Sequence, residues 1–196
     1  MKYRLLAVLL AAAVVAPVAE ARELSYSYLE GGYARTNLDG FSDPDGWLVG
    51  GSVALGSRFH LFGSYSQQDL RTDLLLDPQA DPVRIDLDVD HWNIGFGYNH
   101  ALGDRADLVL RLAYEKLDIE LFDSEAVSLE VGVRGLLGER FEGWAMAGYA
   151  DAKHGSGDAY ARLGAQYRFN RAWGLVADAR ISDGDSSVFF GPRFSF

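Results

Sequence analysis

Four histidines could carry catalytic chemistry: His60, His91, His100 and His154. His91 is the strongest candidate, because Asp88 or Asp90 could orient or activate its imidazole, with water as the nucleophile. No Gly-x-Ser-x-Gly sequence and no metal-type histidine pair accompanies it. We therefore expect no catalytic site, metal or cofactor, and keep a hydrolase centred on His91 as the weaker alternative.

Charged residues on alternate positions of apolar stretches are the second set of candidates. If those stretches are strands, alternate positions share one face, and these charges lie opposite the apolar face. They are Glu30, Arg111, Glu115, Glu130, Arg134, Arg162, Asp178 and Arg180. The set predicts either an ion path or a salt-bridged interior. We favour the salt-bridged interior, with Glu130 and Arg134 near its middle, because small barrels are filled by their own side chains.

Seven aspartates lie between Asp69 and Asp90 and suggest calcium as a ligand. The stretch lacks the compact loop spacing and glycine turn of a dedicated calcium site. We expect a solvated acidic surface instead.

The first residues predict a cleaved secretory signal peptide. Lys2 and Arg4 precede an apolar run, and Ala19-Glu20-Ala21 supplies the small residues of a cleavage site. The apolar run is shorter than the roughly 20 residues that a membrane-spanning helix needs. We expect a signal peptide over residues 1–21 and a single domain over residues 22–196.

Composition narrows the function classes. The chain carries a net charge of −10, and binding nucleic acid draws on clustered Lys and Arg, so we expect no nucleic-acid partner. It contains no cysteine, so a secreted fold must be closed by something other than disulfides.

Ten short runs alternate between apolar and other residues, which predicts ten strands. They are Leu24 to Leu38, Gly46 to Gly56, Phe59 to Thr72, Arg84 to His100, Ala106 to Asp118, Val127 to Leu137, Phe141 to Asp151, Asp158 to Phe169, Trp173 to Asp183 and Ser187 to Phe196.

The connections between these runs alternate between tight turns and longer acidic loops. The longer ones are Asp39 to Asp45, Asp69 to Val83, Ile119 to Ala126, Ala152 to Gly157 and Ser182 to Ser186. Bacterial outer-membrane barrels have this asymmetry, with short turns on the periplasmic side. The pattern predicts a closed antiparallel transmembrane β-barrel of ten strands, with eight as the alternative and both termini periplasmic.

Aromatic residues near the run ends predict two belts at the membrane interfaces, represented by Trp47, Trp92, Tyr114, Tyr167 and Trp173. Two features do not fit the pattern of apolar residues outside and polar residues inside. The apolar residues of Phe141 to Asp151 fall on both faces, so its inner face stays unassigned. Pro192 removes a hydrogen-bond donor from a strand that closure makes interior.

An ordered series of motifs gives the chain a family resemblance. It includes Tyr28-Leu29-Glu30-Gly31-Gly32-Tyr33, Ile94-Gly95-Phe96-Gly97-Tyr98-Asn99-His100 and the ending Gly191-Pro192-Arg193-Phe194-Ser195-Phe196. With these motifs the chain resembles the Ax-twenty-one family, small outer-membrane barrels of xanthomonad-type bacteria once put forward as quorum and plant-immunity signals. The resemblance implies an outer-membrane location and makes Phe196 the aromatic end that barrel-assembly machinery recognises.

The expected function is that of a largely plugged barrel with a structural, surface-interaction or signalling-related role carried by its extracellular loops. A narrow porin-like channel is the main alternative. The expected partners are outer-membrane lipid, lipopolysaccharide and the barrel-assembly machinery, and the expected state is a monomer.

Overall fold

A computed structural model describes residues 24–38, 43–74, 83–119, 122–153 and 157–196. The predicted signal peptide and His154 lie outside these residues. No helix among the described residues is long and apolar enough to cross a membrane. The strands are β1 (Tyr28–Leu38), β2 (Asp45–Leu55), β3 (Phe59–Leu74), β4 (Val83–Ala101), β5 (Ala106–Ile119), β6 (Phe122–Leu136), β7 (Phe141–Ala152), β8 (Asp158–Arg168), β9 (Trp173–Ser182) and β10 (Asp185–Ser195).

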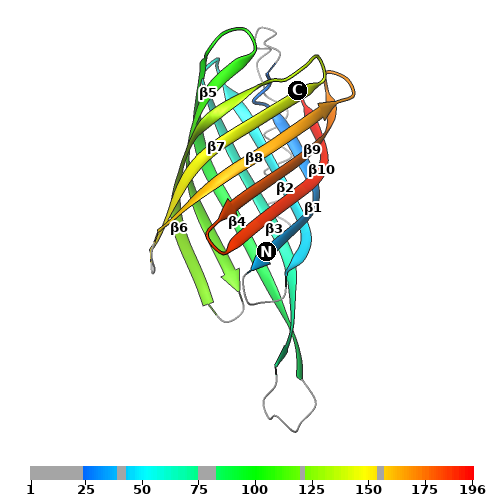
Figure 1. Ribbon diagram of the computed structural model, residues 1–196, viewed down its shortest axis with the longest axis vertical. Coiled ribbons are helices and arrows are strands. Elements are labelled where there is room, and N and C mark those ends of the chain that lie inside the picture. Colours follow the sequence, from blue (N-terminus) through cyan, green and yellow to red (C-terminus); the bar gives the residue numbers. More distant parts are fainter. Residues whose placement is uncertain (1–23, 39–42, 75–82, 120–121, 154–156) are drawn as a thin grey trace.

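The strands form one closed antiparallel barrel (Figure 1). Each strand pairs with its neighbours in chain order, and β1 pairs with β10 to complete the ring. Closure leaves no unpaired sheet edge, which is the condition for strands to lie in lipid. The prediction of ten strands is confirmed, and the alternative of eight is wrong.

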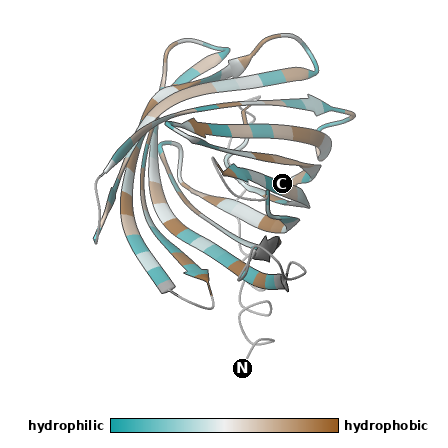
Figure 2. Ribbon diagram, turned by 60° about the horizontal axis from the view of Figure 1, so that its bottom comes forward, coloured by the Kyte–Doolittle hydropathy of each residue, from teal (hydrophilic) through white to brown (hydrophobic). Residues whose placement is uncertain are grey.

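The two faces of the wall are reversed relative to a water-soluble protein. Large apolar side chains are exposed, such as Ile94 at 59% and Leu129 at 54%, whereas Arg134 is only 4% exposed. Figure 2 shows hydrophilic and hydrophobic residues alternating along the strands. This arrangement suits a hydrocarbon environment outside and a polar interior.

Aromatic side chains gather on the outer wall near the two ends of the barrel. Near the loop end, Trp47 packs on Tyr65 at 5.3 Å and Trp92 on Tyr114 at 5.4 Å between ring centroids. Near the end with the short turns, the neighbours include Tyr167 with Phe141 at 5.0 Å, and Trp173 with Phe194 at 5.0 Å. All five predicted belt residues lie in these two groups.

Short turns join β2 to β3, β4 to β5, β6 to β7 and β8 to β9. Gly56 and Gly103 adopt positive φ angles of 73° and 141° in two of them, conformations that a residue with a Cβ rarely adopts. The described chain ends meet at the same end of the barrel, because the Phe196 amide donates to the Ser27 carbonyl at 3.0 Å.

Three of the predicted long loops are shorter than expected. β5 continues to Ile119 and β6 begins at Phe122, and only Asp183 and Gly184 separate β9 from β10. The predicted loop from Asp69 to Val83 is also shorter, because β3 continues to Leu74 and β4 begins at Val83. Polar residues at these strand ends obscure the period-two pattern, because neither face needs to be apolar outside the membrane.

β3 and β4 continue beyond the barrel as a two-stranded projection, seen at the bottom of Figure 1. We call the described residues 67–74 and 83–90 the arm. Its pairing runs from Gln67 opposite Asp90 to Leu74 opposite Val83, and Arg71 lies opposite Asp86. The Arg71 side chain makes its ion pair with Asp69 on its own strand, at 3.4 Å. Asp69 itself lies opposite Asp88, and like charges at paired positions are destabilising.

The structure assigns the inner face of β7. Trp144 and Met146 are buried inside the barrel, whereas Phe141 and Tyr149 are exposed on its outer wall, each at 52%. The amphiphilic indole of Trp144 therefore belongs to the lumen and not to an interfacial belt.

Pro192 lies on the outer face at the seam between β1 and β10. The pairing of these strands is interrupted at Gly31 and Gly32, which face Pro192 and Gly191, and resumes in the same register at Tyr33. A Cβ built at Gly32 would lie 2.2 Å from the Phe190 carbonyl oxygen. Glycine allows this close approach, so the missing proline N–H interrupts the ladder without shifting it.

Candidate functional site

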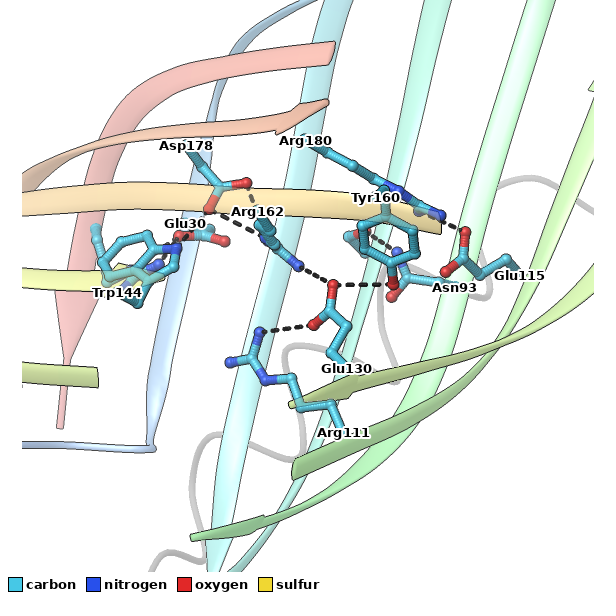
Figure 3. A network of polar contacts seen from close by, with 12 residues as sticks. Glu30, Asn93, Arg111, Glu115, Glu130, Trp144, Tyr160, Arg162, Asp178 and Arg180 are labelled. Atoms are coloured by element: carbon cyan, nitrogen blue, oxygen red, sulfur yellow. Dashed lines mark hydrogen bonds and ion pairs between the residues drawn. The ribbon is translucent and has the colours of Figure 1, made fainter. Parts of the chain in front are cut away.

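The inner wall carries a polar network that crosses the lumen, with Glu130 of β6 at its centre (Figure 3). The Glu130 carboxylate is 4.0 Å from Arg111 and 3.7 Å from Arg162, and the Tyr160 hydroxyl donates to it at 3.1 Å. Glu130 and Arg111 are both buried. The contacts join β5, β6 and β8, and removal of a member would leave an uncompensated buried charge.

Asp178 of β9 extends the network toward β7. It accepts hydrogen bonds from Arg162 Nε at 2.9 and 3.1 Å and from the indole N–H of Trp144 at 2.6 Å. Arg162 thus lies between two carboxylates, those of Glu130 and Asp178 (Figure 3).

Glu115 forms the part of the network toward the loop end. Arg180 donates to it at 2.8 Å and the Ser128 hydroxyl at 2.5 Å, and His91 Nε2 lies 3.6 Å away. The Arg180 guanidinium also lies 3.7 Å from the centre of the Tyr160 ring, a cation–π contact that links this part to Glu130.

Glu30 pairs with Arg193 across the β1–β10 seam, through Nε at 2.8 Å and Nη2 at 2.6 Å. Arg193 also reaches Gln166 at 3.3 Å and lies 4.0 Å from the centre of the Tyr28 ring. The charged pair therefore stabilises the seam where Pro192 interrupts the backbone ladder.

Arg134 lies nearer the short turns, apart from Glu130. It donates to Glu142 at 2.5 Å and to the Ser25 carbonyl at 2.8 Å. The expectation that Arg134 and Glu130 lie together in the middle is not met, because residues four apart on a strand are separated by about 13 Å. Glu142 was not among the predicted residues, since its strand had no assigned face.

The segment 24–27 covers the lumen at the turn end. The predicted strand Leu24 to Leu38 is wrong for these four residues, because β1 begins at Tyr28. The Tyr26 ring stacks on the fully buried His60 at 4.7 Å, and its hydroxyl donates to Asp107 at 3.0 Å. The Arg134 guanidinium lies 4.6 Å from the centre of the same ring. We call Tyr26, His60, Asp107, Arg134 and Glu142 the turn-end cluster.

Burial raises the pKa of the Tyr26 phenol. The hydroxyl therefore remains protonated at ordinary pH and available as a donor to Asp107. The Ser27 hydroxyl accepts from the Ala54 amide at 3.1 Å, which ties the same segment to β2.

The space left among the network side chains is small. A polar cavity of about 60 Å³ is bordered by Glu30, Arg111, Glu115, Glu130, Arg162 and Arg180, among others. A cavity of this size holds only a few water molecules.

The residues considered for catalysis are not brought together. His91 faces the lumen beside Glu115, whereas Asp88 and Asp90 occupy the opposite face of β4, where Tyr65 donates to Asp90 at 2.7 Å. Successive strand residues alternate in direction, so the predicted pairing of His91 with either aspartate is wrong. No group of three or more His, Asp or Glu in the described parts of the chain could hold a metal ion.

A closed barrel with an apolar outer wall and a charged interior is an integral membrane barrel. Residues 6–189 match the model of the outer membrane protein beta-barrel domain, and the chain belongs to this family. Its outer-membrane location follows from that membership. The more specific resemblance to the Ax-twenty-one family stays a prediction.

Solved structures with a TM-score above 0.5 share the barrel fold at low sequence identity. The translocator domain of the autotransporter NalP from Neisseria meningitidis has 12% identity and a TM-score of 0.55, covering 100% of this chain and 95% of that domain. The NanC porin has 10% identity and a TM-score of 0.54, covering 87% of this chain and 100% of the porin. Ail of Yersinia pestis has 14% identity and a TM-score of 0.41, covering 88% and 99% of the two chains. No curated protein matches the sequence.

Proposed function

We propose that this protein is a closed outer-membrane barrel that acts through its surface and passes little or no solute. The observation that carries the proposal is the cavity of about 60 Å³ bordered by paired arginines and carboxylates. For a solute to pass, several of these buried ion pairs would have to separate together. Each separation is costly, because it leaves buried charges without their partners.

The turn-end cluster adds a second barrier. Tyr26 lies across the interior, with contacts to His60 on β3, Asp107 on β5 and Arg134 on β6. A solute that passed the central network would still meet this ring. A narrow channel remains the competing function, and it requires both barriers to move.

The arm is the proposed interaction surface. It is the part of the described chain that projects farthest from the barrel in Figure 1, and binding surfaces tend to lie on elements carried by a rigid scaffold. Asp69, Asp86 and Asp88 are exposed and share one face of it. This acidic face suits a basic partner, or divalent cations bridging it to the phosphates of lipopolysaccharide.

Other roles are proposed in keeping with this architecture. The outer wall contacts lipid and lipopolysaccharide, the short turns and both termini face the periplasm, and the chain works as a monomer. The exposed ring of Phe196, 6.1 Å from Phe194, is available to barrel-assembly machinery during biogenesis. We propose no enzymatic activity, since His91 has Glu115 and not an adjacent aspartate beside it.

Two experiments test the proposal separately. Liposomes containing the wild-type barrel should swell no faster in small sugars than protein-free liposomes, and rapid swelling would contradict closure. For the arm, replacing residues 68–89 by Asn-Gly, which favours a two-residue hairpin between the paired Gln67 and Asp90, should leave the barrel folded but remove its effect on cell contact or biofilm. A shortened barrel that keeps the full effect would exclude the arm as the interaction site.

A further inference from the structure

The outer wall has a continuous row of very small residues. Ala106, Gly135, Gly143, Ala165 and Ala177 occupy paired positions on five successive strands, β5 to β9. All five point outward, whereas β4 and β5 next to them carry Ile94, Phe96, Leu110 and Leu112 on the same wall. The outer wall is therefore lower along this row than beside it, because alanine and glycine project less than leucine, isoleucine or phenylalanine.

This row is the floor of a groove with a volume of about 880 Å³. Val133, Leu163 and Val188 border it toward the loop end, and Leu137 borders it toward the turns. Phe190 and Tyr33, which continue the row in register on β10 and β1, close it at the far end. Ala145 and Ala179, two residues farther toward the loops on β7 and β9, also line it, so the floor of small residues widens over these two strands.

The groove runs diagonally from one end of the barrel toward the other. It begins at Ala106, the first residue of β5 beside a short turn, and rises to Ala177, which lies four residues into β9. Four strand spacings of about 4.8 Å give a length of about 19 Å. One leaflet is about 15 Å of hydrocarbon, half of a core of about 30 Å, and a chain tilted by about 45° needs about 21 Å to cross it.

A cationic side chain lies at the lower end of this path. Arg105, exposed in the β4–β5 turn, lines the groove next to Ala106 and Leu137. Its neighbour Asp104 is the nearest acid in sequence, and no ion pair to Arg105 is found among the described residues. Guanidinium groups bind phosphates in bidentate geometry.

We propose that this groove binds one phospholipid of the leaflet at the turn end, with an acyl chain along the small residues and its phosphate on Arg105. The cation at one end and the aromatic side chains at the other match the polarity of such a lipid. A second copy of the barrel is the competing occupant, and the length of the groove and Arg105 at its turn end favour the lipid. The proposal rests on the short turns facing the periplasm and is independent of whether the lumen is closed.

The test uses the full mature barrel reconstituted in phosphatidylethanolamine and phosphatidylglycerol vesicles at three to one, with spin-labelled phosphatidylglycerol as the probe. Ala177→Phe fills the groove and Arg105→Ala removes the phosphate ligand. Ala161→Phe and Arg171→Ala are matched controls, since both residues are exposed but neither lines the groove. Folding is checked by heat-modifiable gel migration.

Wild type should show an immobilised lipid component that is displaced by unlabelled lipid as a single class. Either groove variant should weaken its affinity by about tenfold, the loss expected for one charged hydrogen bond or the filled floor, and both controls should leave it unchanged. Equal effects of groove and control variants would overturn the proposal. A dimer in native mass spectra that Ala177→Phe dissociates, with lipid retention unaltered, would overturn it in favour of a second copy. Arg105→Ala changes only an exposed turn and should fold. Its lipid affinity therefore tests the proposal even if Ala177→Phe fails to fold.

Discussion

Replacement of Arg134 by methionine should destabilise the barrel strongly, because it breaks a buried ion pair and leaves one carboxylate behind. The side chains of Arg134 and Glu142 are 4% and 3% exposed, and their atoms are 2.5 Å apart. Breaking a buried pair by removing one partner costs about 3–5 kcal/mol. The variant also loses the hydrogen bond to the Ser25 carbonyl, so we expect a loss toward the upper part of that range.

The double variant Arg134→Met with Glu142→Gln distinguishes ion pairing from packing. It removes both charges together, so its loss of unfolding free energy should be clearly smaller than the sum of the two single losses. Arg35→Met is the matched control, because Arg35 pairs with Asp43 at 2.6 Å on the exposed surface. That variant should unfold at the same denaturant concentration as wild type.

The assay is equilibrium urea unfolding of the barrel refolded into phospholipid vesicles, followed by tryptophan fluorescence. A loss of less than about 1 kcal/mol for Arg134→Met, within the range of ordinary surface substitutions, would refute the argument. Additive losses in the double variant would also refute it, because they would show that the two side chains act independently.

Two further substitutions test the seam and the lumen. Gly32→Ala should reduce folding yield and stability, because its Cβ would lie 2.2 Å from the Phe190 carbonyl oxygen, whereas Gly31→Ala should be tolerated with its nearest contact at 3.5 Å; equal yields on refolding gels would contradict the close approach at the seam. Trp144→Phe should lose about 1.5–3 kcal/mol in urea unfolding, the range for a hydrogen bond to a charged group, because its indole N–H donates to Asp178 at 2.6 Å; a smaller loss than for Trp173→Phe on the outer wall would show that the bond does not stabilise the fold.

The strands could be predicted because the membrane imposes one rule on every residue of the wall. Apolar side chains must face lipid and polar ones must face inward, so Leu108, Leu110 and Leu112 mark β5 without any tertiary information. β7 escaped this rule because the lumen of this barrel also accepts Trp144 and Met146. Because apolar residues lie on both faces of this strand, the pattern does not predict whether the Glu142 side chain points into the lumen or outward.

Which charges pair could not be predicted, because pairing depends on the offset of strands across the lumen. Glu130 and Arg134 share a strand face, and yet they bind Arg162 and Glu142 from different strands. The alternation of Leu24, Tyr26 and Tyr28 predicts a strand that includes the segment 24–27. The same alternation turns Tyr26 inward, where Asp107 and His60 retain it at the opening. The sequence does contain a signal for this contact, because a tyrosine hydroxyl at an inward position needs a polar partner when it is buried.

Single-channel recording of the wild-type barrel in planar bilayers tests the closed lumen most directly. We expect at most rare small openings, because both the Glu130 network and the turn-end cluster obstruct the interior. Tyr26→Gly with Glu130→Ala, which weakens both barriers, should open more often than either single variant. Large and steady conductance from the wild type would contradict the closed barrel and establish the channel instead.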